Sequence, residues 1–120
     1  MALKIFLSGV AVFCALAIVY VYSLYAGFFF SIWWWDIPMH IGGGVLAGLI
    51  GAWFSIIFSG RVSLLSIFAG VIVLGVAVEA LEYALGFTYS PFMSYPVDTA
   101  KDLVDDLVGG VIVGYLLARV

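Results

Sequence analysis

Four long apolar stretches alternate along the chain with short segments rich in polar, glycine or aromatic residues. Each stretch reaches or exceeds the roughly 20 residues with which an α-helix crosses a bilayer. We therefore predict an all-α fold, an integral membrane four-helix bundle that forms one domain over residues 1–120. The predicted spans cover about residues 3–30, 38–59, 63–85 and 98–118.

Residues at the predicted helix ends support this division. Asp36 can cap the second span, in whose first turn Pro38 is tolerated, and Gly86 can end the third. Between the first two spans, residues 28–30 are phenylalanines and residues 33–35 are tryptophans. Such aromatic clusters favour an interfacial belt at the level of the lipid head groups, with a ligand-stacking site as the alternative.

The composition agrees with a membrane protein. Hydrophobic residues make up 67% of the chain and charged residues 9%, and the mean hydropathy is +1.31. These values are typical of proteins that reside in a bilayer. The net charge of −3 and the lack of a basic cluster argue against a nucleic-acid partner. Membrane lipid is the expected environment and partner.

The few basic residues predict the orientation. In a chain of four spans, Lys4, Arg61 and Arg119 lie on one side of the membrane and Lys101 lies on the other. The positive-inside rule then places both termini in the cytoplasm. All seven acidic residues fall on the opposite, outer side. Their distribution is the most informative feature of the sequence.

Four of the acids share one face of the fourth span. On a helix that turns by about 100° per residue, one arc about 100° wide holds Asp98, Asp102, Asp105 and Asp106, with Gly109 on the same stripe. A charge near the bilayer centre costs at least a few kcal/mol, so ionisable residues within spans face a bundle interior or a cavity. We expect the other spans to supply partners for this face.

The second and third spans carry suitable groups. Glu79 and Glu82 lie three residues apart, on one face of the third span. His40, the only histidine, shares its face of the second span with glycines, and small residues let another helix approach closely. We expect helix contacts at Gly44, Gly48, Gly51 and Gly109.

These groups enter the bundle at two depths. At about 1.5 Å per residue, the outer layer lies about 5 to 6 Å inside the helix ends and contains His40, Glu82 and Asp102. The inner layer lies about 9 to 12 Å inside and contains Glu79, Asp105 and Asp106. The layering predicts one polar site formed by His40, Glu79, Glu82, Asp102 and Asp106, with Asp36, Asp98 and Asp105 as secondary members. As alternatives, Asp36 and Asp98 are only helix caps, and Asp105 faces a neighbouring subunit.

The donor atoms of this site predict a divalent cation as cofactor. Carboxylate oxygens suit Mg²⁺, Mn²⁺ or Ca²⁺, and the imidazole adds Zn²⁺ or Fe²⁺. Without a cation or shared protons the acids would repel one another. Lys101 lies on the flank of the aspartate face and can neutralise only one charge.

The order of these motifs resembles that of a known family. The chain is similar to the YjdF-like inner-membrane proteins, which in turn resemble the VanZ-like group, over about residues 36–118. Three motifs carry the resemblance: Asp36-x-x-x-His40 followed by glycines, Glu79-x-x-Glu82, and Asp98-Thr99-x-x-Asp102. The resemblance implies a prokaryotic inner-membrane protein with a polar intramembrane site at His40, Glu79, Glu82, Asp98 and Asp102. Relatives can carry more spans, which implies here a minimal version that forms a homo-oligomer.

Three classes of function fit this pattern. In the first, the cation holds a phosphate-bearing lipid head group for recognition or hydrolysis, with His40 as a ligand or general base. No nucleophile motif is recognisable, so the sequence leaves open whether the protein is an enzyme. In the second, the acids relay protons or cations across an oligomer, although the inner half of the bundle has no acid or histidine to continue the path. In the third, the chain is a small subunit of a larger membrane complex, in which the acids pair with a partner's arginines or His40 ligates a pigment.

Overall fold

The computed structural model describes residues 1–119, and the all-α prediction is confirmed for this range. Four long helices and one short helix follow one another: α1 (Ala2–Ala26), α2 (Phe28–Ser31), α3 (Asp36–Ser59), α4 (Leu64–Leu85) and α5 (Tyr95–Leu117). Three of them, α1, α3 and α4, are long and apolar enough to cross a membrane. These three helices indicate a membrane protein.

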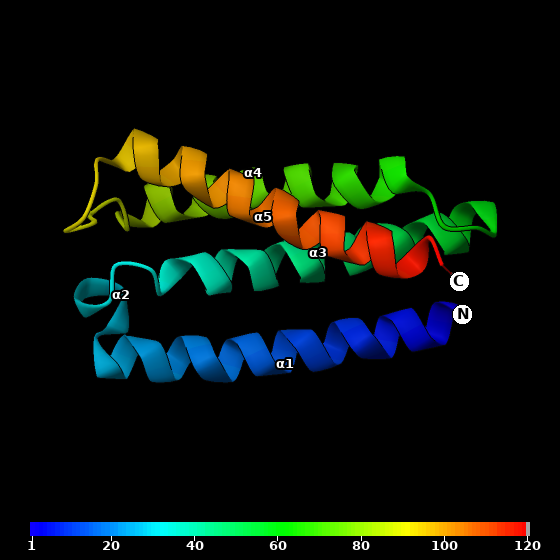
Figure 1. Cartoon of the computed structure of the whole chain (residues 1–120), viewed down its shortest axis with the longest axis horizontal. Coiled ribbons are helices and arrows are strands. Elements are labelled where there is room, and N and C mark those ends of the chain that lie inside the picture. Colours follow the sequence, from blue (N-terminus) through cyan, green and yellow to red (C-terminus); the bar gives the residue numbers. More distant parts are fainter. Residues whose placement is uncertain (120) are drawn as a thin grey trace.

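Glycines end the first three long helices. Gly27, Gly60 and Gly86 have φ angles of 69°, 72° and 79°, a left-handed conformation that glycine adopts without a steric penalty. The first helix therefore ends at Ala26 and not at residue 30 as predicted. After Gly27 the chain continues as the short α2, which leads into the connection to α3 at one end of the molecule (Figure 1).

The last helix begins earlier than predicted, at Tyr95. Pro96 is tolerated in its first turn because the missing N–H has no partner within the helix at that position. Asp98 lies in this first turn, and Asp36 is the first residue of α3. Neither aspartate occupies a cap position, so the interpretation of Asp36 and Asp98 as helix caps is wrong.

Helix α3 lies at the centre of the bundle. It contacts α1 on one side and both α4 and α5 on the other, and α4 and α5 also contact each other (Figure 1). Both chain termini and the α3–α4 connection lie at one end, which we call the terminal end (Figure 1). The opposite end, which we call the α2 end, holds α2 and the α4–α5 connection (Figure 1). The buried apolar core contains Ile5, Ala52, Ile67 and Val113, all in the parts of their helices nearer the terminal end.

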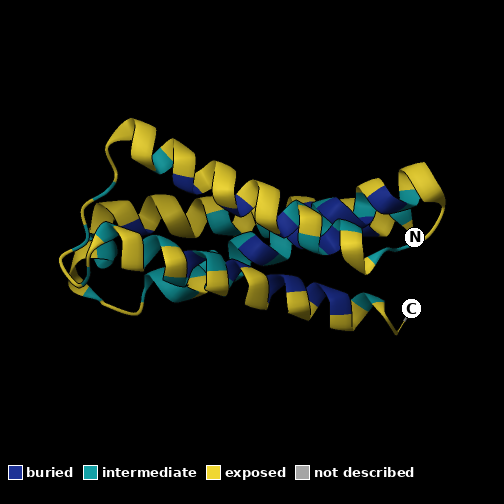
Figure 2. Cartoon of the chain, turned by 90° about the horizontal axis from the view of Figure 1, so that it is seen from above, coloured by how far each residue is buried: buried dark blue, intermediate teal, exposed yellow. Residues whose placement is uncertain are grey.

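Apolar side chains cover much of the outer surface. Buried positions follow the inner faces of the helices, and the outward faces are exposed (Figure 2). Among the exposed residues, Phe58, Leu65 and Ile18 have 82%, 79% and 71% of their surface accessible. A contiguous apolar surface of this extent is unusual for a protein surrounded by water and suits contact with lipid.

Glycines bring the inner helices into close contact. A methyl group added at Gly44 would overlap the backbone of α5, and one added at Gly109 would overlap the backbone of α3. Gly51 meets the backbone of α4 in the same way, while Gly48 lies against a valine side chain of α5. The contact between α3 and α5 places the first turns of α3 beside the acid face of α5.

Candidate functional site

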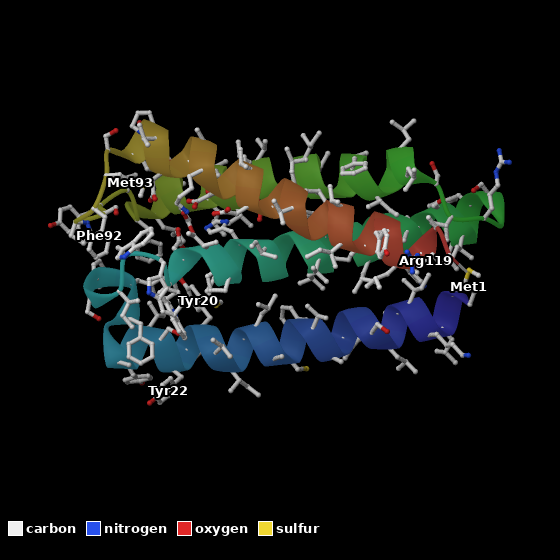
Figure 3. The ribbon with its side chains drawn as sticks, viewed as in Figure 1. Met1, Tyr20, Tyr22, Phe92, Met93 and Arg119 are labelled. Carbon is white, nitrogen blue, oxygen red and sulfur yellow. The ribbon has the colours of Figure 1, made fainter. Side chains whose placement is uncertain are left out.

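Charged side chains from α3 and α5 meet near the α2 end of the bundle. Nitrogen and oxygen atoms gather there between the two helices (Figure 3). Helix α3 supplies two residues, one turn apart on the same face, and α5 supplies four. We call this set the charged cluster; it consists of Asp36, His40, Lys101, Asp102, Asp105 and Asp106.

His40 faces carboxylates with both of its ring nitrogens. Its Nε2 lies 3.5 Å from Asp36 Oδ1 and 3.4 Å from Asp102 Oδ2. Its Nδ1 lies 3.5 Å from Asp106 Oδ1. A neutral imidazole can donate from only one nitrogen. The other nitrogen therefore faces carboxylate oxygens favourably only when a proton or a cation lies between them.

Lys101 is the second source of positive charge in the cluster. Its Nζ lies 3.2 Å from Asp36 Oδ2 and 3.2 Å from Asp105 Oδ2, and it also contacts Asp102 Oδ1. Sequence reasoning placed Lys101 on the flank of the aspartate face and missed these three contacts. Its spacing to Asp105 was a usable signal, because residues four apart are neighbours on a helix.

Asp36 and Asp102 each divide their two carboxylate oxygens between the two basic residues. One oxygen of each contacts the Lys101 ammonium, and the other faces His40 Nε2. One donor atom from each of Asp36, His40 and Asp102 lies within 4.8 Å of the other two. Lys101 thus holds both carboxylates with their free oxygens turned toward the imidazole.

The spacing of these donor atoms suits a metal ion. With metal–ligand bonds of about 2.0 to 2.2 Å, two ligands of a tetrahedral ion lie about 3.3 to 3.6 Å apart. The distances of 3.4 and 3.5 Å from His40 Nε2 to Asp102 and Asp36 lie within this range. A carboxylate beside the second ring nitrogen, here that of Asp106, commonly orients a metal-binding histidine. These two separations are compatible with a metal site, and the Asp36 and Asp102 donor atoms lie within 4.8 Å of each other.

The charged cluster contains more negative than positive groups. Lys101 and a protonated His40 supply at most two positive charges, against four carboxylates. The side chains of Asp102 and Asp106 are only 4% and 9% exposed, so water screens their charges poorly. A bound cation or shared protons would offset the excess.

Glu79 lies on α4 and is hydrogen-bonded to α5, outside the charged cluster. Thr99 Oγ1 donates a hydrogen bond of 2.7 Å to Glu79 Oε2, and the Tyr95 hydroxyl donates one of 3.3 Å to the Glu79 carbonyl oxygen. Glu79 is buried, and its Oε1 has no hydrogen-bond partner within residues 1–119. Leaving a buried carboxylate oxygen unpaired is costly. Sequence analysis included Thr99 in a motif but did not predict its bond to Glu79, although Thr99 lies seven residues before Asp106 and so near the same helical face.

The structure divides the predicted site residues into three groups. The charged cluster contains three of the five predicted primary residues, His40, Asp102 and Asp106, and two of the predicted secondary residues, Asp36 and Asp105. Glu79 is bonded to Thr99 instead. Glu82 and Asp98 are partly exposed, and neither side chain makes an ion pair or hydrogen bond in the described part of the chain.

A link between the charged cluster and α4 runs through Gly75, one turn before Glu79. A methyl group at Gly75 would lie 2.6 Å from Asp106 Oδ2. The carboxylate of Asp106 therefore borders α4 as well as α3, and the absence of a side chain at Gly75 gives it room.

No protein-family model, curated protein or solved structure matches the chain. The functional interpretation rests on the geometry of the charged cluster and on the sequence.

Proposed function

We propose that the protein is an integral membrane protein of four spans that binds a divalent cation through Asp36, His40 and Asp102. One observation carries the proposal. Asp36 and Asp102 each contact Lys101 with one carboxylate oxygen and face His40 with the other. Lys101 and Asp106 orient the ligands without binding the ion. Mg²⁺, Mn²⁺ and Ca²⁺ suit the oxygens, and Zn²⁺ also suits the imidazole.

Helix α5 serves as the fourth span despite its charges. Asp102 and Asp106 are buried in the bundle, whereas Val104, Val111 and Tyr115 are 58%, 56% and 57% exposed. The helix thus turns its acids inward and an apolar surface outward, as ionisable residues within membrane spans usually require.

The charged cluster lies near the outer leaflet in this proposal. Lys4, Arg61 and Arg119 belong to the terminal end, which the positive-inside rule places in the cytoplasm. The resemblance to YjdF-like and VanZ-like proteins supports a prokaryotic inner membrane. The three motifs meet in pairs: Asp102 of the third faces His40 of the first, and Thr99 of the third is bonded to Glu79 of the second.

The bound cation holds a phosphate-bearing lipid head group. Three protein ligands leave coordination positions open, and a cation with open positions binds phosphate oxygens and can activate water. The Asp36 side chain is 29% exposed, so the ion is reachable from the α2 end beside this residue. Binding of this kind serves recognition of the head group or, with an activated water, its hydrolysis.

Elemental analysis of the protein purified in mild detergent tests the cation site. The wild type should contain a stoichiometric divalent metal, and Asp102→Asn and His40→Ala should lose it. Asp98→Asn is the matched control, because it removes a charge from the same helix outside the cluster, and it should retain the metal. A wild type without metal after washing without chelator, or metal retained in both site variants, would contradict the proposal.

Transport of protons or cations by an oligomer is the second candidate, favoured by the unpartnered Oε1 of Glu79. Buried carboxylates within spans are used as proton carriers. The path would have to continue through the terminal half of the bundle, where the spans contain no acid or histidine. Flux across liposome membranes that Glu79→Gln abolishes, with metal content unchanged, would move the assignment to transport.

A further inference from the structure

An apolar groove runs between α1 and α3. Two hollows of about 260 and 240 Å³ lie along it and share Phe13 and Leu46 in their walls, so they adjoin. The groove extends from Ile5 and Phe54, nearer the terminal end, to Tyr20 and Met39, nearer the α2 end. Its lining side chains are apolar except for the hydroxyl of Tyr20 and the indole N–H of Trp53. We call this the α1–α3 groove.

Unequal contact along α1 creates the groove. At Gly42 of α3 a methyl group would lie 2.6 Å from the side chain of Leu16, so the two helices touch there. Gly9 of α1 is buried, yet a methyl group there would meet no atom within 4 Å. The space beside Gly9 is therefore open, and no side chain of the described residues fills it.

We propose that the α1–α3 groove binds one hydrocarbon chain of the phosphate-bearing lipid whose head group the cation holds, an inference that rests on the proposed function. Met39, in the wall of the groove, directly precedes His40. Tyr20 lies between α1 and α3 at the same end (Figure 3). The groove thus carries no charge along its length and reaches the α2 end of α3, where the charged cluster lies on the α5 side of the same helix. An apolar groove that leads to this end complements a molecule with an apolar chain and a charged head.

The dimensions favour a chain over a helix of a second copy. Between Met39 and Phe54 the groove follows α3 for about 22 Å at 1.5 Å per residue. This length exceeds half of the hydrocarbon core of a bilayer, which is about 30 Å thick. A helix is about 10 Å across with its side chains and could insert only single side chains into hollows of about 260 and 240 Å³, whereas a hydrocarbon chain can follow their whole length.

Photo-crosslinking tests the proposal. The probe is phosphatidic acid with a photoreactive group midway along one acyl chain, in phosphatidylcholine vesicles that contain the reconstituted protein. In the wild type, mass spectrometry should find the label on Phe13 and Leu46. Gly9→Leu fills the empty space and should lower this labelling about tenfold, as expected if the new side chain displaces about two methylene groups.

Controls separate this proposal from the cation site. Ala11→Leu places the same new side chain at an exposed position of α1 and should label like the wild type. Gly9→Leu should keep the wild-type melting temperature and metal content, because Gly9 lies outside the charged cluster. Labelled Phe13 and Leu46 in a protein without metal would contradict the cation site alone and leave the chain site supported.

Three results would overturn the proposal even when metal is bound. The first is equal labelling in the wild type and in Gly9→Leu. The second is label spread evenly over the outer surface of the helices. The third is crosslinking of two protein chains through groove residues, which would assign the groove to a second copy.

Discussion

The two halves of the contact among α3, α4 and α5 join the same helices with different chemistry. Toward the terminal end, Ala52, Ile67 and Val113 pack as a buried apolar core, and Gly51 brings α3 against α4. Toward the α2 end, Gly44 brings α3 equally close to α5, but the helices there enclose the charged cluster.

The comparison separates packing from charge. In the terminal half, glycines and apolar residues join these helices without charged groups of the described residues between them. Burial of charged groups costs several kcal/mol per ion, which their mutual attraction offsets only in good geometry. Helix packing therefore does not account for four carboxylates, a histidine and a lysine in the other half. The proposed binding of a cation would account for them.

Of the substitutions considered, loss of Lys101 should lower the free energy of unfolding most. Lys101→Met leaves Asp36, Asp102 and Asp105 without their shared cation, and removing one partner of a buried ion pair costs about 3 to 5 kcal/mol. We expect the free energy of unfolding in detergent to fall by about this amount. The measurement requires a chelator, so that no metal replaces the ammonium.

Lys4→Met is the matched control for this experiment. Lys4 is exposed and makes no ion pair in the described part of the chain, so its loss should leave the free energy of unfolding almost unchanged. Equal stability of the two variants would mean that Lys101 does not hold the cluster together.

Two adjacent glycines test whether backbone contact matters in the charged half. In Gly44→Ala the methyl group overlaps the backbone of α5, and overpacking of this kind costs about 1 to 3 kcal/mol. In Gly43→Ala the methyl group lies at an ordinary distance, 3.6 Å from Asp106 Oδ1. Thermal unfolding in detergent should show a lower melting temperature for Gly44→Ala alone. A similar loss in both variants would contradict the close approach at Gly44.

The smallest effects are expected for the acids outside the charged cluster. Glu82→Gln and Asp98→Asn remove charges that make no ion pair or hydrogen bond within residues 1–119. We expect each to change the free energy of unfolding by no more than about 0.5 kcal/mol and to leave the metal content as in the wild type. Loss of metal in either variant would extend the site toward α4 or the start of α5.

Helical periodicity predicted which residues face inward, but not which of them meet. His40, Asp102 and Asp106 were expected to share a site, and they lie together in the charged cluster. Glu79 was assigned to the same site and lies instead against Thr99. Periodicity specifies the face and depth of a residue on its own helix, whereas the rotation of α4 relative to α5 depends on side-chain contacts between them.

The contacts of Lys101 also could not be predicted from helical periodicity. Its angle on α5 placed it at the flank of the acid face, but a lysine side chain is long and flexible, and its contacts depend on where neighbouring acids lie. Asp36, which the sequence also allowed as a helix cap, supplies one of these acids from α3. Nothing within α5 alone could have predicted that contact.

The sequence by itself determined the helical, membrane-type character of the chain, the placement of all acids toward one end and the small-residue stripe of α3, because apolar content and periodicity are local properties. Only the tertiary structure decided that Asp36 and Asp102 divide their oxygens between Lys101 and His40, and that a groove opens between α1 and α3. Both features depend on the distance and the rotation between neighbouring helices. The contact of Gly44 with the α5 backbone and the contact of Leu16 with Gly42 set two of these distances.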